Sequence, residues 1–172
     1  MISIVLYGRN DSYGYNLHKR AAISFNALAE VMSDADDEIL FVDYNTPDDH
    51  PTFPEAIHDT LTDKAKRHMR ILRVRPEQHA HLKSKTHLVA LESQSRNVAL
   101  RRSNPNNRWI LYTNTDMLLV PRNEKESLSE IQSPGCVWRC WSTALLKRAI
   151  CSDVCCAVSS RWRSSSVENL LR

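Results

Sequence analysis

Strand-like and helix-like patterns alternate along the first 122 residues, and this alternation most limits what the chain can fold into. The first strand-like segment is "ISIVLY" (2–7), a short apolar run typical of a strand covered on both faces. Further segments of this kind are "EILFVDY" (38–44), "MRILRV" (69–74), "WILY" (109–112) and "MLLV" (117–120). Strands separated by helices predict a layered α/β fold with a parallel sheet.

The segments between these strands carry helical signals. Residues 17–32 place Leu17, Ala21, Phe25, Leu28 and Met32 at helical spacing. Thr52 and Glu55 have the spacing of a capping box, which predicts a helix from there to about residue 67. A third helix is predicted over 88–102, followed by a turn at "NPNN". Ligands of such sheets bind at the carboxyl ends of the strands, so residues just after each strand are the candidate site.

Length and composition indicate which classes of protein the chain can belong to. The chain has 172 residues, enough for one domain with a sizeable core, and its 42% hydrophobic and 25% charged residues are ordinary for a soluble globular protein. The net charge of +3 comes without a basic stripe, so no nucleic-acid partner is expected. Neither a signal peptide nor an apolar run of membrane-spanning length is present, which predicts a cytoplasmic chain with no transmembrane segment.

The last 41 residues differ from the rest, because all five cysteines lie between Cys136 and Cys156 and the strand–helix alternation stops. We expect a domain over 1–131 and a poorly ordered Cys/Trp/Ser-rich tail over 132–172. A genuine module and a frameshift product both fit this composition. The cysteine spacing is admissible for zinc, but the tail contains no histidine, so incidental thiols are the favoured interpretation.

Four segments together resemble the nucleotide-binding half of a family 2-type glycosyltransferase with the GT-A fold. They are "ISIVLYGRND", "EILFVDYNTPDD", "SRNVALRRS" and "WILYTNTDMLLVP". The resemblance implies a layered Rossmann-like sheet of the GT-A type, incomplete at the C-terminus. The second half of such enzymes usually carries the acceptor site and the catalytic base, and residues 132–172 do not match it. The resemblance therefore implies a truncated, catalytically incomplete chain, whose catalytic residues stay unknown.

The resemblance also implies a donor site and its residues. The nucleotide of a nucleotide-sugar would contact Tyr7, Asp43, Arg96 and Asn97. Asp43 would accept hydrogen bonds from the base or ribose, and Arg96 would pair with phosphate. The acceptor, whether glycan, lipid or protein, is left open.

A metal site is implied at "NTD", which stands where the family has an Asp-x-Asp motif. Asp116 would contact a divalent cation, Mn²⁺ or Mg²⁺, with Asn114 as an oxygen ligand or a supporting partner. The family's proline a few residues on corresponds to Pro121. Asn114 departs from the family's first aspartate. The alternative is a solvated connection in which both side chains only form Asx turns.

Two other functions compete with the glycosyltransferase hypothesis. One is a non-catalytic nucleotide-binding or protein-interaction module. The other, a nucleotidyltransferase, would need a glycine-rich phosphate loop after the first strand, where the chain has only Gly8 and Gly14. A histidine metal site in "QHAHLKSKTH" is disfavoured by its neighbouring lysines, so His79, His81 and His87 are predicted to lie in a solvated loop.

Overall fold

Four parallel strands form the main sheet in a computed structural model that describes residues 1–11, 16–120, 128, 139–142 and 158–160. They are β1 (Ile2–Gly8), β2 (Glu38–Tyr44), β3 (Met69–Val74) and β4 (Trp109–Tyr112). The strand order is β3-β2-β1-β4-β7, in which the short β7 (Val158–Ser160) runs antiparallel to β4. The prediction of an α/β fold around a parallel sheet is confirmed.

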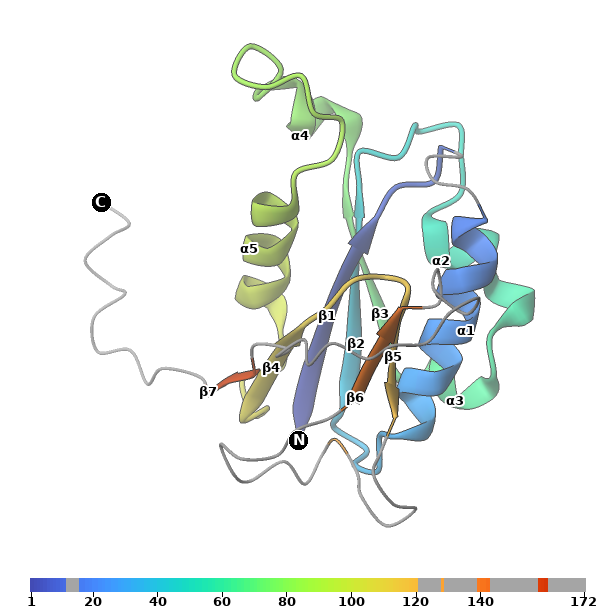
Figure 1. The fold of residues 1–172 in the computed structure, drawn as a ribbon. Helices are drawn as coiled ribbons and strands as arrows, with labels where there is room; N and C mark the ends of the chain where they lie inside the picture. The colour runs from blue at the N-terminus through green and yellow to red at the C-terminus, as the bar shows by residue number, and fades with distance from the viewer. Residues whose placement is uncertain (12–15, 121–127, 129–138, 143–157, 161–172) are drawn as a thin grey trace.

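Helices cover both faces of this sheet (Figure 1). On one face lie α1 (Leu17–Glu30), α2 (Phe53–Ala56) and α3 (Asp63–His68), and on the other lies α5 (Glu92–Arg102). Side chains alternate along a strand, so β1 contributes Ile2, Ile4 and Leu6 to the core under α1 and Val5 to the core under α5. Both faces of β1 are therefore buried, as its continuous apolar sequence predicts.

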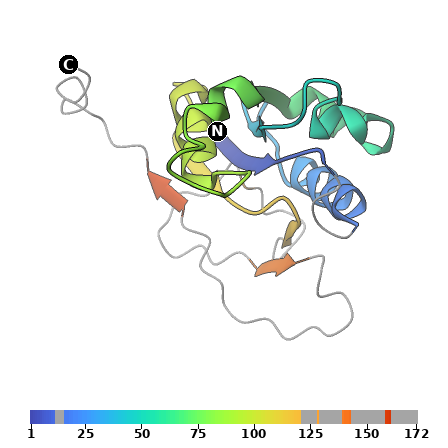
Figure 2. The same cartoon turned by 90° about the horizontal axis from the view of Figure 1, so that it is seen from above.

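A second, two-stranded sheet pairs β5 (Met117–Val120) with β6 (Arg139–Ser142) in antiparallel register. Seen from above, this pair stands apart from the main sheet (Figure 2). Both β6 and β7 come from the region predicted to be a tail. Pro121, the cysteine side chains and most of residues 132–172 lie outside the described residues, so the predicted domain boundary stays a prediction.

The helix predicted from Thr52 to about residue 67 is broken in the structure. Its beginning is confirmed, because the Glu55 carboxylate accepts a hydrogen bond from the Thr52 N–H at 2.8 Å. The chain then forms α2, a 3₁₀ turn η1 (His58–Thr60) and α3. The break falls at Leu61, which takes an extended backbone and is buried, and Thr62 caps the next helix through the Ala65 N–H.

The helix predicted over 88–102 begins later, at Glu92. The residue before it, Leu91, has an extended backbone, and two residues earlier the Val89 carbonyl accepts hydrogen bonds from the side chains of Arg9 and Asn45 instead of from a helical N–H. A short helix that the sequence did not predict, α4 (Pro76–Ala80), follows β3. Together α4 and residues 81–91 rise above the carboxyl end of the sheet (Figure 1). Within the described part of the chain, no helix combines the length and apolar character needed to cross a membrane.

The end of β1 is tightly packed at Gly8. A Cβ added there would lie 2.9 Å from Cζ of Phe41, whose ring is stacked on Phe53 and meets Phe25 edge-on. Because the ring is held on two sides, Gly8→Ala is expected to lower the free energy of unfolding by about 1–3 kcal/mol in urea denaturation. In a Phe41→Leu background the same substitution should cost at least ~1 kcal/mol less. An equal cost in both backgrounds would contradict this packing.

Candidate functional site

The carboxyl edge of the main sheet contains a reversal of strand order. From β1 the chain proceeds outward to β2 and β3 and then returns to the other side of β1 as β4. In open parallel sheets, ligands bind in the crevice at such a reversal, outside the carboxyl ends of the strands. Two features lie at this edge: a cavity beyond β1 and β2, and the turn between β4 and β5.

The first feature, which we call the strand-end cavity, has a volume of about 800 Å³. Small-molecule sites typically measure roughly 300–1,000 Å³, so a nucleotide would fit. Its described lining includes three basic side chains and no acidic one. The lining residues are Arg9, Asn45, Pro47, Pro76, His79, Ala80, Lys83, Ser84, Lys85, Thr86, His87, Leu88 and Val89.

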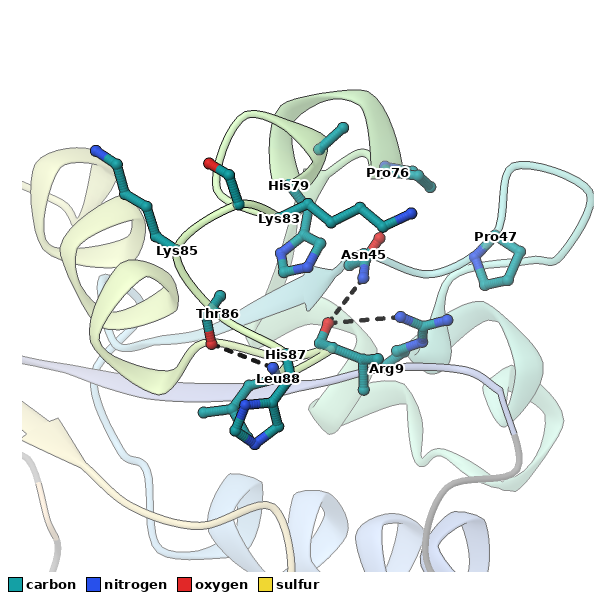
Figure 3. Close-up of a pocket in the computed structure, with 13 residues that line it drawn as sticks. Arg9, Asn45, Pro47, Pro76, His79, Lys83, Lys85, Thr86, His87 and Leu88 are labelled. Atoms are coloured by element: carbon teal, nitrogen blue, oxygen red, sulfur yellow. Dashed lines mark hydrogen bonds between the residues drawn. The ribbon is translucent and has the colours of Figure 1, made fainter.

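One wall of the strand-end cavity is fastened by the Val89 carbonyl. It accepts hydrogen bonds from Asn45 Nδ2 at 2.8 Å and from Arg9 Nη1 at 3.4 Å. Figure 3 shows these two side chains converging from β1 and β2, with the His79 ring close by and Lys85 extending away. Arg9 is also ion-paired with Asp11 at 2.6 Å. Donors that follow β1 and β2 thus converge on one carbonyl group of the cavity wall.

His79 corrects the prediction that all three histidines lie in a solvated loop. His79 is buried, and its Nδ1 lies 3.2 Å from the Tyr44 hydroxyl. Burial raises the pKa of the Tyr44 hydroxyl above its ordinary value. His81 and His87 are exposed, as predicted. The sequence placed His79 in a polar stretch, and the difference arises because α4 folds it down onto β2.

Asp43, predicted to contact the nucleotide, is fully buried and does not line the cavity. Its Oδ1 accepts hydrogen bonds from Thr46 Oγ1 at 2.8 Å and from the Phe53 N–H at 2.9 Å. Thr46 Oγ1 accepts in turn from the Asn10 N–H at 2.9 Å. In this structure Asp43 therefore organises the loops after β1 and β2, and its contact with a nucleotide stays a prediction.

The second oxygen of Asp43 is buried without a hydrogen-bond partner, and Arg73 Nε lies 3.9 Å from it. Burial raises the pKa of the Asp43 carboxyl, while the hydrogen bonds from Phe53 and Thr46 and the charge of Arg73 oppose that rise. The net effect is upward, which is unusual for a carboxylate with this many favourable neighbours.

The second feature is the turn between β4 and β5, which places Asn114 and Asp116 at the carboxyl end of β4. Asn114 is exposed, whereas the Asp116 side chain is 19% exposed and forms an ion pair with Arg20 of α1. The sequence did not indicate that Arg20 would be the partner of Asp116. Thr115 fastens the turn to β1 by donating a 2.6 Å hydrogen bond to the Tyr7 carbonyl.

This turn fits a divalent cation only in part. Carboxylate and amide oxygens are suitable ligands for Mg²⁺ or Mn²⁺, and both come from the same turn. One Asp116 oxygen is already bonded to Arg20. Across the described ranges, no group of three or more His, Cys, Asp or Glu side chains is placed to hold a metal ion. A cation here would need most of its ligands from phosphate and water.

The other predicted nucleotide contacts do not line the strand-end cavity. The half-buried Tyr7 ring packs on the core under α5. Arg96 is ion-paired with Glu92, and its guanidinium lies 5.3 Å from the Tyr112 ring centre. Asn97 is exposed on α5. The structure thus brings Asn114 and Asp116 together at the strand ends and leaves the two α5 residues outside the cavity.

Asn45 and His79 are lining residues that the sequence did not predict as site residues. A signal for Asn45 was available, because asparagine tolerates left-handed backbone and Asn45 has φ 59°. That conformation turns the chain away from β2, and the Asn45 side chain bonds the Val89 carbonyl. His79 gave no such signal, since its burial depends on contact with Tyr44, 35 residues earlier.

No protein-family model and no curated protein matches the chain. Several solved structures do match it in fold. Over 69% of the chain the fold is similar to residues 1–349 of TarS from S. aureus, with a TM-score of 0.42 and 17% identity. The galactosyltransferase LgtC matches with a TM-score of 0.43 and 16% identity over 69% of the chain. Mouse xyloside xylosyltransferase 1 matches with a TM-score of 0.40 and 10% identity over 69% of the chain. The chain spans 28%, 39% and 44% of these structures, respectively.

The raised pKa of Asp43 predicts a particular pH dependence of stability. The native state binds the Asp43 proton more tightly than the unfolded chain does, so this group favours folding as pH falls from above its raised native pKa towards 3.8. In urea denaturation between pH 7 and pH 4, wild type should gain stability relative to Asp43→Asn as pH falls. If the difference in unfolding free energy between wild type and Asp43→Asn did not change with pH, or fell as pH falls, the burial of the Asp43 carboxylate would be contradicted.

Proposed function

We propose that the chain binds a nucleotide-sugar donor at the carboxyl ends of β1, β2 and β4, as the nucleotide-binding part of a glycosyltransferase. One observation carries the proposal: the end of β1 lies between a cavity of nucleotide size with a basic lining, to which Arg9 contributes, and a turn bearing a carboxylate, which Thr115 bonds to Tyr7. The resemblance of four sequence segments to family 2-type glycosyltransferases supports it independently. We propose that sugar transfer belongs to a whole enzyme of this kind, and that this chain supplies its donor site but is catalytically incomplete.

The strand-end cavity and the β4–β5 turn would bind different parts of the donor. In the strand-end cavity, Asn45 and Arg9 each have N–H groups besides the one bonded to the Val89 carbonyl, and these would donate hydrogen bonds to a ligand rich in oxygen acceptors. His79 of α4 and Lys83, which follows α4, would add further hydrogen-bond donors. The diphosphate would extend past the end of β1 toward Asp116, since Arg9 and the Tyr7 carbonyl connect both features to the same strand.

We further propose Asp116 as the protein's contact to a divalent cation, with Asn114 as an additional oxygen ligand. When bound, such a cation would offset the negative charge that develops on the leaving diphosphate. Asp116 would hold the cation beside the β1 end, and the Thr115 contact to Tyr7 would keep the turn in place. The donor's phosphates would supply ligands that the described residues lack.

A non-catalytic nucleotide-binding module would use the same site but would leave the bound donor intact. Transfer requires an acceptor site and a base in addition to the donor site. A chain that binds donor, with neither hydrolysis of the sugar–phosphate bond nor transfer to glycan, lipid or peptide acceptors, would belong to the non-catalytic class.

Thermal unfolding tests donor binding and identifies the base. With UDP-, GDP- and TDP-sugars in turn, one ligand at about 100 times its Kd should add roughly 2.7 kcal/mol of stability. For a chain of this size each kcal/mol raises Tm by about 2–4 °C. Arg9→Gln should reduce the shift strongly, whereas Arg101→Gln, at an exposed position of α5, should leave it unchanged.

The same measurement with and without Mn²⁺ tests Asp116. Wild type should show a larger shift with nucleotide and Mn²⁺ together than with nucleotide alone, and Asp116→Asn should abolish that difference. Asp59→Asn, at a fully exposed position, is the control and should behave as wild type. A cooperatively unfolding chain that none of the nucleotides stabilises would overturn the proposed function.

A further inference from the structure

The ion pair between Arg20 and Asp116 joins α1 to the turn predicted to bind a cation. The two residues are 96 positions apart, and Arg20 Nη1 contacts Asp116 Oδ2 directly. Their side chains are 24% and 19% exposed, so both are accessible to dissolved ions. A guanidinium and a divalent cation seek the same carboxylate oxygens, and their like charges repel at close range. A divalent cation that binds Asp116 would therefore have to compete with Arg20 for the carboxylate oxygens.

The backbone of the turn does not depend on this ion pair. Thr115 Oγ1 donates to the Tyr7 carbonyl at 2.6 Å, and the Thr113 N–H donates to the Val5 carbonyl at 3.2 Å. Ser24, one turn of α1 beyond Arg20, donates a separate hydrogen bond to the Met117 carbonyl. These contacts fix the turn on both β1 and α1. The Arg20 side chain can exchange partners without displacing Asp116.

Resting on the proposed function, we propose that Arg20 is an internal competitor for Asp116 that links cation binding to donor binding. Arg20 neutralises Asp116 in the free chain. When Asp116 binds a cation, the guanidinium is displaced from the carboxylate and becomes available, at the same turn, to pair with the donor's diphosphate. Arginine suits this second role because its planar group binds phosphate through two parallel hydrogen bonds.

Removal of the Arg20 charge should change the affinities for Mn²⁺ and for the nucleoside diphosphate in opposite directions. In Arg20→Gln the competitor is removed, so Mn²⁺ alone should bind about tenfold more tightly or better, measured from the electron paramagnetic resonance signal of free Mn²⁺. At saturating Mn²⁺ the same variant should bind the nucleoside diphosphate that wild type binds (UDP, GDP or TDP) about tenfold more weakly by calorimetry. Lys19→Gln, on the same turn of α1 and exposed, is the matched control and should match wild type for both ligands.

A purely structural role for Arg20 would weaken the binding of both ligands together or leave both unchanged, and either result overturns the proposal. If Arg20→Gln does not fold, Arg20→Lys replaces it. The ammonium lacks the planar fork, so this variant should also bind Mn²⁺ more tightly than wild type, and equal affinity would overturn the proposal.

Failure of the Arg20 role is distinguishable from failure of the donor site. Tighter Mn²⁺ binding by Arg20→Gln, with no binding of UDP, GDP or TDP by wild type or variant, would uphold the competition at Asp116 and overturn both the donor site and the diphosphate role of Arg20. UDP binding by wild type with unchanged Mn²⁺ affinity in Arg20→Gln would uphold the donor site and overturn the role of Arg20.

Discussion

The parallel pairing of β1 with β2 on one edge and β4 on the other is the constraint on which the rest of the structure depends. The two ladders join Ser3–Gly8 to Glu38–Asp43 and Ile2–Val5 to Trp109–Tyr112. Because the strands run the same way, their carboxyl ends meet at one edge of the sheet. Arg9 then emerges beside Asn45, and the Tyr7 carbonyl lies where Thr115 can fasten the next turn. The candidate site is thus a consequence of strand pairing.

The strands could be predicted from the sequence because their signal is local. Strands are short runs rich in apolar residues, and the ranges expected for the parallel β2, β3 and β4 and for the antiparallel β5 match those observed. Helix boundaries were less predictable because they depend on distant partners. The helix after Thr52 breaks where Leu61 turns into the core. The segment before α5 is extended at Leu91, and its Val89 carbonyl is bonded to side chains at the ends of β1 and β2.

The candidate site was predictable in position and less so in detail. Strand ends identified both Asp43 and Asp116, but a strand-end position does not say whether a carboxylate faces solvent. Asp43 is enclosed by Thr46 and the Phe53 N–H, and Asn45 takes its place at the cavity. The partner of Asp116 comes from α1, and no pattern in the sequence joins Arg20 to a residue 96 positions away. Tertiary contacts of this kind decide which polar residues are available for function.

Mapping a bound nucleotide by amide chemical shifts tests the donor site most directly. ¹⁵N-labelled chain is titrated with UDP, GDP and TDP, and the backbone amides that move on saturation are identified. We expect one nucleotide to shift the amides of Arg9, Asn45 and Val89, at the strand-end cavity, and those of the turn at Thr115, while exposed Ile23 and Leu100 stay unchanged. Saturable shifts confined to another face of the sheet, or no shifts with any of the three nucleotides, would contradict a donor site at the carboxyl ends of β1, β2 and β4.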